Sequence, residues 1–124
     1  MPKAVVNLED TERIELKTLD GAFVVLRRMS FGQITERRAL MKLSIASSKG
    51  SKDVKGEMAM ANALITQYEF RSCVVEHNLE KDDVGTLLNL SSPVDLASLD
   101  PRVGQEIESL IEARNNFDED DQEN

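Results

Sequence analysis

The chain has 124 residues, which is enough for one domain with a modest core. Apolar residues make up 40% of it but aromatic residues only 4%, so we expect an aliphatic, largely helical core. The net charge of −8 argues against a nucleic-acid partner, because phosphate backbones are bound by accumulated Lys and Arg.

The charge is unevenly distributed along the chain. Residues 25–55 contain eight basic and two acidic residues, whereas residues 76–124 contain fourteen acidic and three basic residues. Such a separation can steer a partner or a second copy of the chain, although two ordinary solvated faces would give the same pattern.

Cellular location is indicated by what the sequence lacks. Its one cysteine, Cys73, cannot form an internal disulfide, and no stretch approaches the roughly 20 apolar residues of a membrane span. The N-terminus also lacks the apolar stretch of a signal peptide. We therefore expect a cytoplasmic protein without a membrane partner.

The N-terminal part favours a β-hairpin over about residues 12–28. Alternating residues at 13–17 and the run Phe23 to Leu26 flank Asp20-Gly21, a dipeptide suited to a two-residue turn with positive φ at both positions. Val5 and Val6 could supply another strand. Because an isolated hairpin is marginal in water, we expect it to pack on the rest of the domain.

A first helix is predicted from Ser30. Ser30 and Gln33 have the spacing of a capping box, and Met29 and Ile34 that of a hydrophobic staple. Apolar residues at helical spacing continue to about Ile45, and residues 46–57 then have the composition of a flexible linker.

Three further helices are predicted. The longest apolar-rich stretch, 58–77, should form a central buried helix, although Met58 to Met60 could be extended. A turn-forming cluster at 80–85 follows. Ser92-Pro93 and Asp100-Pro101 each indicate a helix start, and a stripe of Val103, Ile107, Leu110 and Ile111 should end near Asn115.

Together these elements predict an α+β fold, with an N-terminal β-hairpin packed on a mostly helical domain of about four helices. We expect residues 1–117 to form one domain and the acidic segment 118–124 to be a disordered tail.

We find no catalytic, metal or cofactor site in the sequence. Cys73 and His77 lie four residues apart on the predicted helix, but zinc requires three or four protein ligands and no others accompany them. The acidic residues near Gly85 break the alternation of a calcium loop. We therefore expect Cys73 to be a packing group and His77 to interact with the last carbonyls of the helix.

Four arginines are the candidate partner-binding residues: Arg27, Arg28, Arg37 and Arg38. With Phe31 they could bind an acidic segment of a protein, whereas the overall acidity disfavours RNA.

The order of several short motifs resembles that of the tail assembly chaperones of long-tailed, siphovirus-type bacteriophages. The matching stretches are 68–79, 85–89, 99–107 and 115–117, after a hairpin that leads into Ser30-Phe31-Gly32. The motif residues, which we expect to have structural roles, are Phe70, Cys73, His77, Asn78, Asn89, Asp100, Arg102 and Gly104.

This resemblance implies a non-enzymatic protein of the host cytoplasm that keeps the tape measure protein soluble until the tail tube assembles around it. It also implies contacts with other copies, with a longer form made by ribosomal frameshifting and with the tail tube protein, and absence from the mature virion. The alternatives are a structural tail completion or connector protein of the virion, a small regulatory adaptor of the host and, least favoured, a small enzyme.

Overall fold

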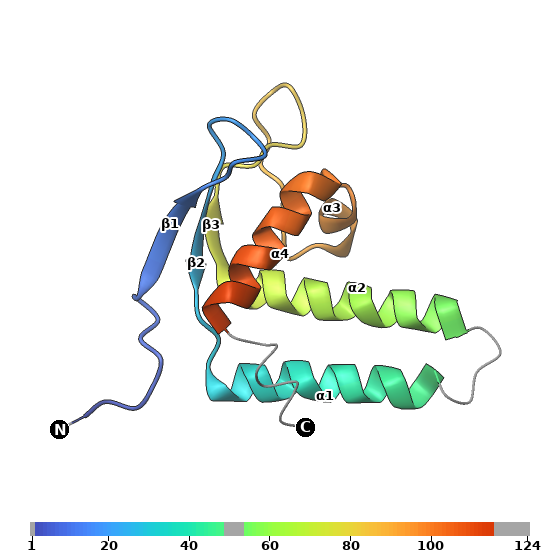
Figure 1. Cartoon of the computed structure of the whole chain (residues 1–124). Helices are drawn as coiled ribbons and strands as arrows, with labels where there is room; N and C mark the ends of the chain where they lie inside the picture. Colours follow the sequence, from blue (N-terminus) through green and yellow to red (C-terminus); the bar gives the residue numbers. More distant parts are fainter. Residues whose placement is uncertain (1, 49–53, 116–124) are drawn as a thin grey trace.

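A computed structural model describes residues 2–48 and 54–115 of the chain. In these residues it contains three β-strands in one antiparallel sheet and four helices, so the predicted α+β class is confirmed. The helices lie on one side of the sheet, and the N-terminal segment leads away from its edge strand (Figure 1). The predicted tail at 118–124 lies outside the described residues.

The predicted β-hairpin is present, with a longer connection than we expected. Strand β1 (Thr11–Glu15) pairs antiparallel with β2 (Phe23–Arg27). Gly21 has a φ of 81°, which suits glycine, but the backbone N–H of Leu16 donates to the carbonyl of Ala22, so five residues form the loop. The predicted two-residue turn is wrong because Leu16 and Ala22, both buried, anchor the loop at its base.

The third strand comes from a different part of the chain than predicted. Val5 and Val6 lie outside any strand, and β3 (Val74–His77) pairs with the free edge of β2. The preceding helix, α2 (Val54–Cys73), therefore ends four residues earlier than predicted. Val74 and Val75 are β-branched, and pairing with β2 satisfies backbone groups that a longer helix would have bonded internally.

Helix α1 (Phe31–Ser48) begins with the predicted capping box. The backbone N–H of Gln33 donates to Ser30 Oγ at 3.2 Å, and the backbone N–H of Ser30 donates to Gln33 Oε1 at 3.0 Å. Met29 is buried, and Ile34 packs against the same core. The linker predicted at 46–57 is too long, because α1 continues to Ser48 and α2 begins at Val54.

Both proline-initiated helices are confirmed. Helix α3 (Pro93–Ala97) follows Ser92, and α4 (Pro101–Asn115) follows Asp100, which accepts a hydrogen bond from the backbone N–H of Arg102 at 2.9 Å. The apolar stripe of α4 faces the core: its buried residues are Val103, Ile107, Ile111 and Asn115.

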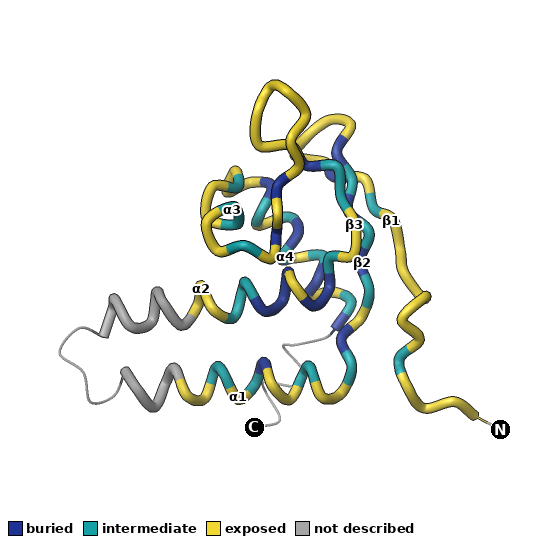
Figure 2. The backbone as a smooth tube through the Cα atoms, turned by 180° about the vertical axis from the view of Figure 1, so that it is seen from behind, coloured by how far each residue is buried: buried dark blue, intermediate teal, exposed yellow. Residues whose placement is uncertain are grey.

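One core connects the sheet to the helices. It lies where the C-terminal half of α2, the apolar stripe of α4 and the inner face of β2 meet (Figure 2). Its most completely buried side chains are Phe70, Leu26, Ile107, Ile111, Val24 and Cys73. Toward its N-terminus α2 leaves this core and becomes exposed at residues 62–64.

Candidate functional site

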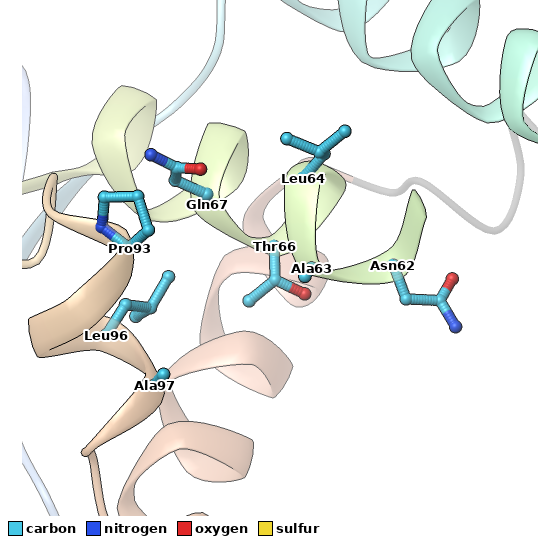
Figure 3. Close-up of a pocket in the computed structure, with 8 residues that line it drawn as sticks. All are labelled: Asn62, Ala63, Leu64, Thr66, Gln67, Pro93, Leu96 and Ala97. Carbon is cyan, nitrogen blue, oxygen red and sulfur yellow. The ribbon is translucent and has the colours of Figure 1, made fainter. Parts of the chain in front are cut away.

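An apolar groove between α2 and α3 is the candidate functional site (Figure 3). Its volume is about 500 Å³. None of the described residues that line it is charged; they are Asn62, Ala63, Leu64, Thr66, Gln67, Pro93, Leu96 and Ala97. Apolar concave surfaces of this size are where proteins commonly bind ligands or peptide segments.

The α2 wall of the groove belongs to the part of that helix that leaves the core. Tyr68 to Phe70 are buried, whereas Ala63 and Leu64 are exposed, Leu64 to 54%. Figure 3 shows Ala63 and Thr66 on the side of α2 toward α3, and Leu64 pointing away from α3 at the groove margin. The wall is therefore made of small side chains that leave space in front of α3.

The α3 wall is short and is held in place by polar contacts of Asp95 and of the groove-lining Gln67. Asp95 Oδ2 accepts from the backbone N–H of Asn89 at 2.8 Å and lies 3.6 Å from Lys81 Nζ. Gln67 Nε2 donates to the carbonyl of Ser91 at 3.4 Å, which connects α2 to the segment before α3. Leu96 packs against the core from this position. These polar contacts and the packing of Leu96 thus hold α3 beside α2.

The structure does not bring the four predicted arginines together on one exposed surface. Arg37 is buried, and its Nε lies 2.7 Å from Oε2 of Glu69 on α2. Arg27 Nε donates to the carbonyl of Ser72 at 2.9 Å. Arg38 is partly buried, and of the four only Arg28 is exposed. The packing of α1 against α2 therefore turns Arg37 inward, which its position in a charged run could not reveal.

Cys73 has the packing role we expected. It is fully buried, and Asn115 Nδ2 lies 3.9 Å from its Sγ. Burial raises the pKa of the thiol to about 12, so it is not an activated nucleophile at neutral pH.

His77 does not have the helix-capping role we expected. It lies on β3 opposite Val24, and its Nδ1 accepts a hydrogen bond from the backbone N–H of Leu79 at 3.0 Å. Burial lowers its pKa. Among the described residues no group of three or more His, Cys, Asp or Glu side chains is placed to hold a metal ion.

The other motif residues support the fold. Phe70 lies in the core, and Asn78 connects β3 to the hairpin, accepting from the backbone N–H of Phe23 at 2.8 Å and donating to the carbonyl of Gly21 at 2.9 Å. Asn89 Oδ1 accepts from the backbone N–H of Ser91. At the start of α4, Asp100 pairs with Arg102, and Gly104 lies against Leu99.

Sequence reasoning missed the groove and two polar contacts. The start of α3 was predicted, but not that Leu96 and Ala97 would face Thr66 and Ala63, about thirty residues earlier. Asn115 was predicted only as the end of the last helix and as part of a motif, whereas its Oδ1 accepts from the backbone N–H of Met29 at 2.8 Å inside the core. The sequence around Arg37 and around Glu69 also contains no pattern that would indicate their pairing.

The comparisons with known proteins do not assign the chain to a family. No protein-family model matches it, and neither the curated proteins nor the solved structures contain a significant match. Within the described part of the chain, no helix has both the length and the apolar character that crossing a bilayer requires.

Proposed function

We propose that the chain is a non-enzymatic binding protein that holds apolar helical segments of a tape measure protein in the cytoplasm of a bacterial host during phage tail assembly. The observation that carries this proposal is the apolar groove between α2 and α3. The resemblance of the motif order to tail assembly chaperones supports the choice of client.

The chemistry of the groove suits such a client. An amphipathic helix binds a groove through apolar residues spaced three and four positions apart, and it needs no charged partner at the centre of the contact. The groove is lined by apolar and uncharged polar side chains, among them Leu64, Pro93 and Leu96, and no charged side chain lies among its described lining residues. A long client with repeated apolar stripes could engage several copies, each with modest affinity.

The test is co-expression of a tape measure fragment with the parent chain and with a double variant, Ala63→Glu and Ala97→Glu. Both alanines are exposed and line the groove, so two carboxylates would be placed where the client's apolar face should lie. The parent should raise the fraction of client that stays in the supernatant after centrifugation, and the double variant should not.

A matched control carries the same two changes elsewhere, at Ala4 and Ala39, which are exposed and do not line the groove. This control should protect the client as well as the parent does. Client protection by the Ala63→Glu, Ala97→Glu variant would exclude the groove as the binding site. Failure of the parent itself to raise client solubility would overturn the chaperone function.

The alternatives make different predictions about the finished particle. A chaperone leaves before the tail is complete, so the chain should be missing from purified virions analysed by mass spectrometry. Its presence at a fixed stoichiometry would instead favour a tail completion or connector protein.

A further inference from the structure

The apolar groove continues into a smaller pocket that reaches α4. This second pocket has a volume of about 180 Å³ and shares Thr66 and Leu96 with the groove. Two acidic residues, Asp100 and Glu108, belong to its lining. The combined surface is therefore apolar at one end and acidic at the other.

The acidic end is built onto the same helix walls as the groove. Glu108 Oε1 accepts a hydrogen bond from Thr66 Oγ1 at 3.2 Å, so its carboxylate is held beside the α2 wall. Asp100, next to the start of α4, accepts hydrogen bonds from the backbone N–H of Arg102 at 2.9 Å and from Arg102 Nη2 at 3.3 Å. Arg102 therefore offsets part of the charge of Asp100, and Glu108 is the main source of negative charge at this end.

The negative potential of this end extends along α4. Glu112 follows Glu108 by one helical turn, and no basic residue is found among the described residues that line either pocket. The pKa of the nearby Glu69 is raised chiefly by burial, and the negative charges of Glu108 and Glu112 raise it further. Glu108 and Glu112 therefore place negative charge on the side of α4 toward α2.

We propose that the occupant of this combined surface is an amphipathic helix that carries Lys or Arg at one end. Its apolar face lies between α2 and α3, and its basic side chains lie beside Asp100 and Glu108. This inference rests on the proposed function, because it specifies which segments of the client the groove selects.

The expected charge preference is modest and depends on salt. Exposed ion pairs are individually weak and are screened over about 10 Å at 0.1 M salt. A peptide with three basic residues at one end should therefore bind about three- to tenfold more tightly than its neutral counterpart at low salt. This ratio should approach one at high salt.

The experiment uses three labelled helical peptides with the same apolar face and with three Lys, three Gln or three Glu residues at one end. Their affinities for the full-length chain are measured by fluorescence anisotropy at low and high salt. Glu108→Gln removes one charge but keeps an oxygen that can accept from Thr66, so it should weaken the Lys peptide selectively. Glu9→Gln, on the exposed N-terminal segment, makes the same change away from the groove and should have no effect.

The possible outcomes separate this inference from the proposed function. Equal binding of all three peptides, abolished by Ala63→Glu with Ala97→Glu, would keep the groove as the client site and overturn the charge preference. A Lys preference that Glu108→Gln leaves unchanged would also overturn the inference. If Glu108→Gln lowered self-association but not peptide affinity, the acidic end would belong to a contact between copies. Failure of the parent to protect the client in co-expression would instead overturn the proposed function.

Discussion

The buried ion pair between Arg37 and Glu69 joins α1 to α2 near the core. Their side chains are only 10% and 6% exposed, and Arg37 Nε lies 2.7 Å from Glu69 Oε2. A buried pair of this kind contributes little over an apolar pair, but removing one partner leaves the other charge without compensation. We expect the pair to matter mainly for the specificity of packing, because other ways of packing α1 on α2 would separate the two charges.

Replacing Arg37 by Leu should lower the free energy of unfolding at pH 7 by about 3 kcal/mol, because Glu69 stays buried without its partner. Burial already raises the pKa of Glu69, and loss of Arg37 removes the main opposing influence. A carboxyl whose pKa is raised by folding binds protons more readily when folded, so the deficit should shrink as the pH falls. Urea denaturation of the variant and the parent at several pH values would measure this pH-dependent loss of stability.

The control for this prediction is Lys42→Leu, which removes an exposed cation from the same helix. It should change stability by no more than about 0.5 kcal/mol at any pH. A small, pH-independent loss in the Arg37 variant would mean that water solvates Glu69 in the absence of its partner.

Cys73→Ala should lower the free energy of unfolding by about 1 kcal/mol through lost packing, without affecting client binding. The thiol is fully buried and its pKa is raised to about 12, so a thiol reagent at pH 8 should label it only as the chain unfolds. Chemical denaturation of the variant measures the loss of stability, and the labelling rate of the parent chain measures how accessible the thiol is. Rapid labelling of the native protein would contradict the buried placement, as would stoichiometric zinc retained after dialysis.

At the scale of elements, the hairpin loop is attached to α4 through one carboxylate. Glu106 accepts hydrogen bonds from the backbone N–H groups of Lys17 and Thr18, at 2.8 Å and 3.0 Å, and from Thr18 Oγ1 at 2.6 Å. Burial is the largest single influence and raises the pKa of Glu106, but these hydrogen bonds together outweigh it and lower the pKa below its ordinary value of 4.5. The loop that connects β1 and β2 is thus anchored to a helix far along the chain.

Glu106→Ala should destabilise the protein by about 1 kcal/mol at pH 7, a value kept low because the carboxylate is partly exposed. A depressed folded-state pKa contributes stability above the unfolded-state pKa, and this contribution is lost as the pH falls through the folded-state value. The difference between variant and parent in urea denaturation should therefore decrease below about pH 4.5.

Glu112→Ala is the matched control for this contact, since it removes an exposed carboxylate from the same helix but away from the hairpin loop. It should leave stability within about 0.5 kcal/mol of the parent. If both variants behaved alike, the hydrogen bonds of Glu106 would contribute nothing measurable in solution.

At the scale of the whole molecule, the separation of charge still predicts weak, salt-sensitive association. Because Arg37 is buried and Arg27 bonds to Ser72, the exposed Arg28 and Lys42 are the residues with which to test it. Reversing both to Glu should lower self-association or client binding at low salt more than at high salt. Sedimentation velocity at two ionic strengths measures self-association, and peptide titration at the same ionic strengths measures client binding.

A control for net charge places the reversal at Lys3 in the exposed N-terminal segment. It should have little effect if the position of the charge matters, and about half the effect if only the total charge does, because it reverses one charge instead of two. Unchanged association in the double variant at low salt would identify Arg28 and Lys42 as part of an ordinary solvated face.

The sequence by itself determined the features that depend on neighbours within a few residues. The capping box of Ser30 and Gln33 and the starts of α3 and α4 at Pro93 and Pro101 were predictable, because their hydrogen bonds and steric limits act within one turn of helix. The apolar stripe of α4 was predictable too, since a period near 3.6 residues places its members on one face.

Only the tertiary structure decided the features that depend on distant partners. Val74 to His77 form a strand because the edge of β2, about fifty residues earlier, supplies their hydrogen-bond partners. On α1, Arg37 is buried and Lys42 is exposed because α2 packs on one face of that helix. The groove exists because a short α3 stands beside the part of α2 that has left the core, and residue spacing along the chain carries no information about that space.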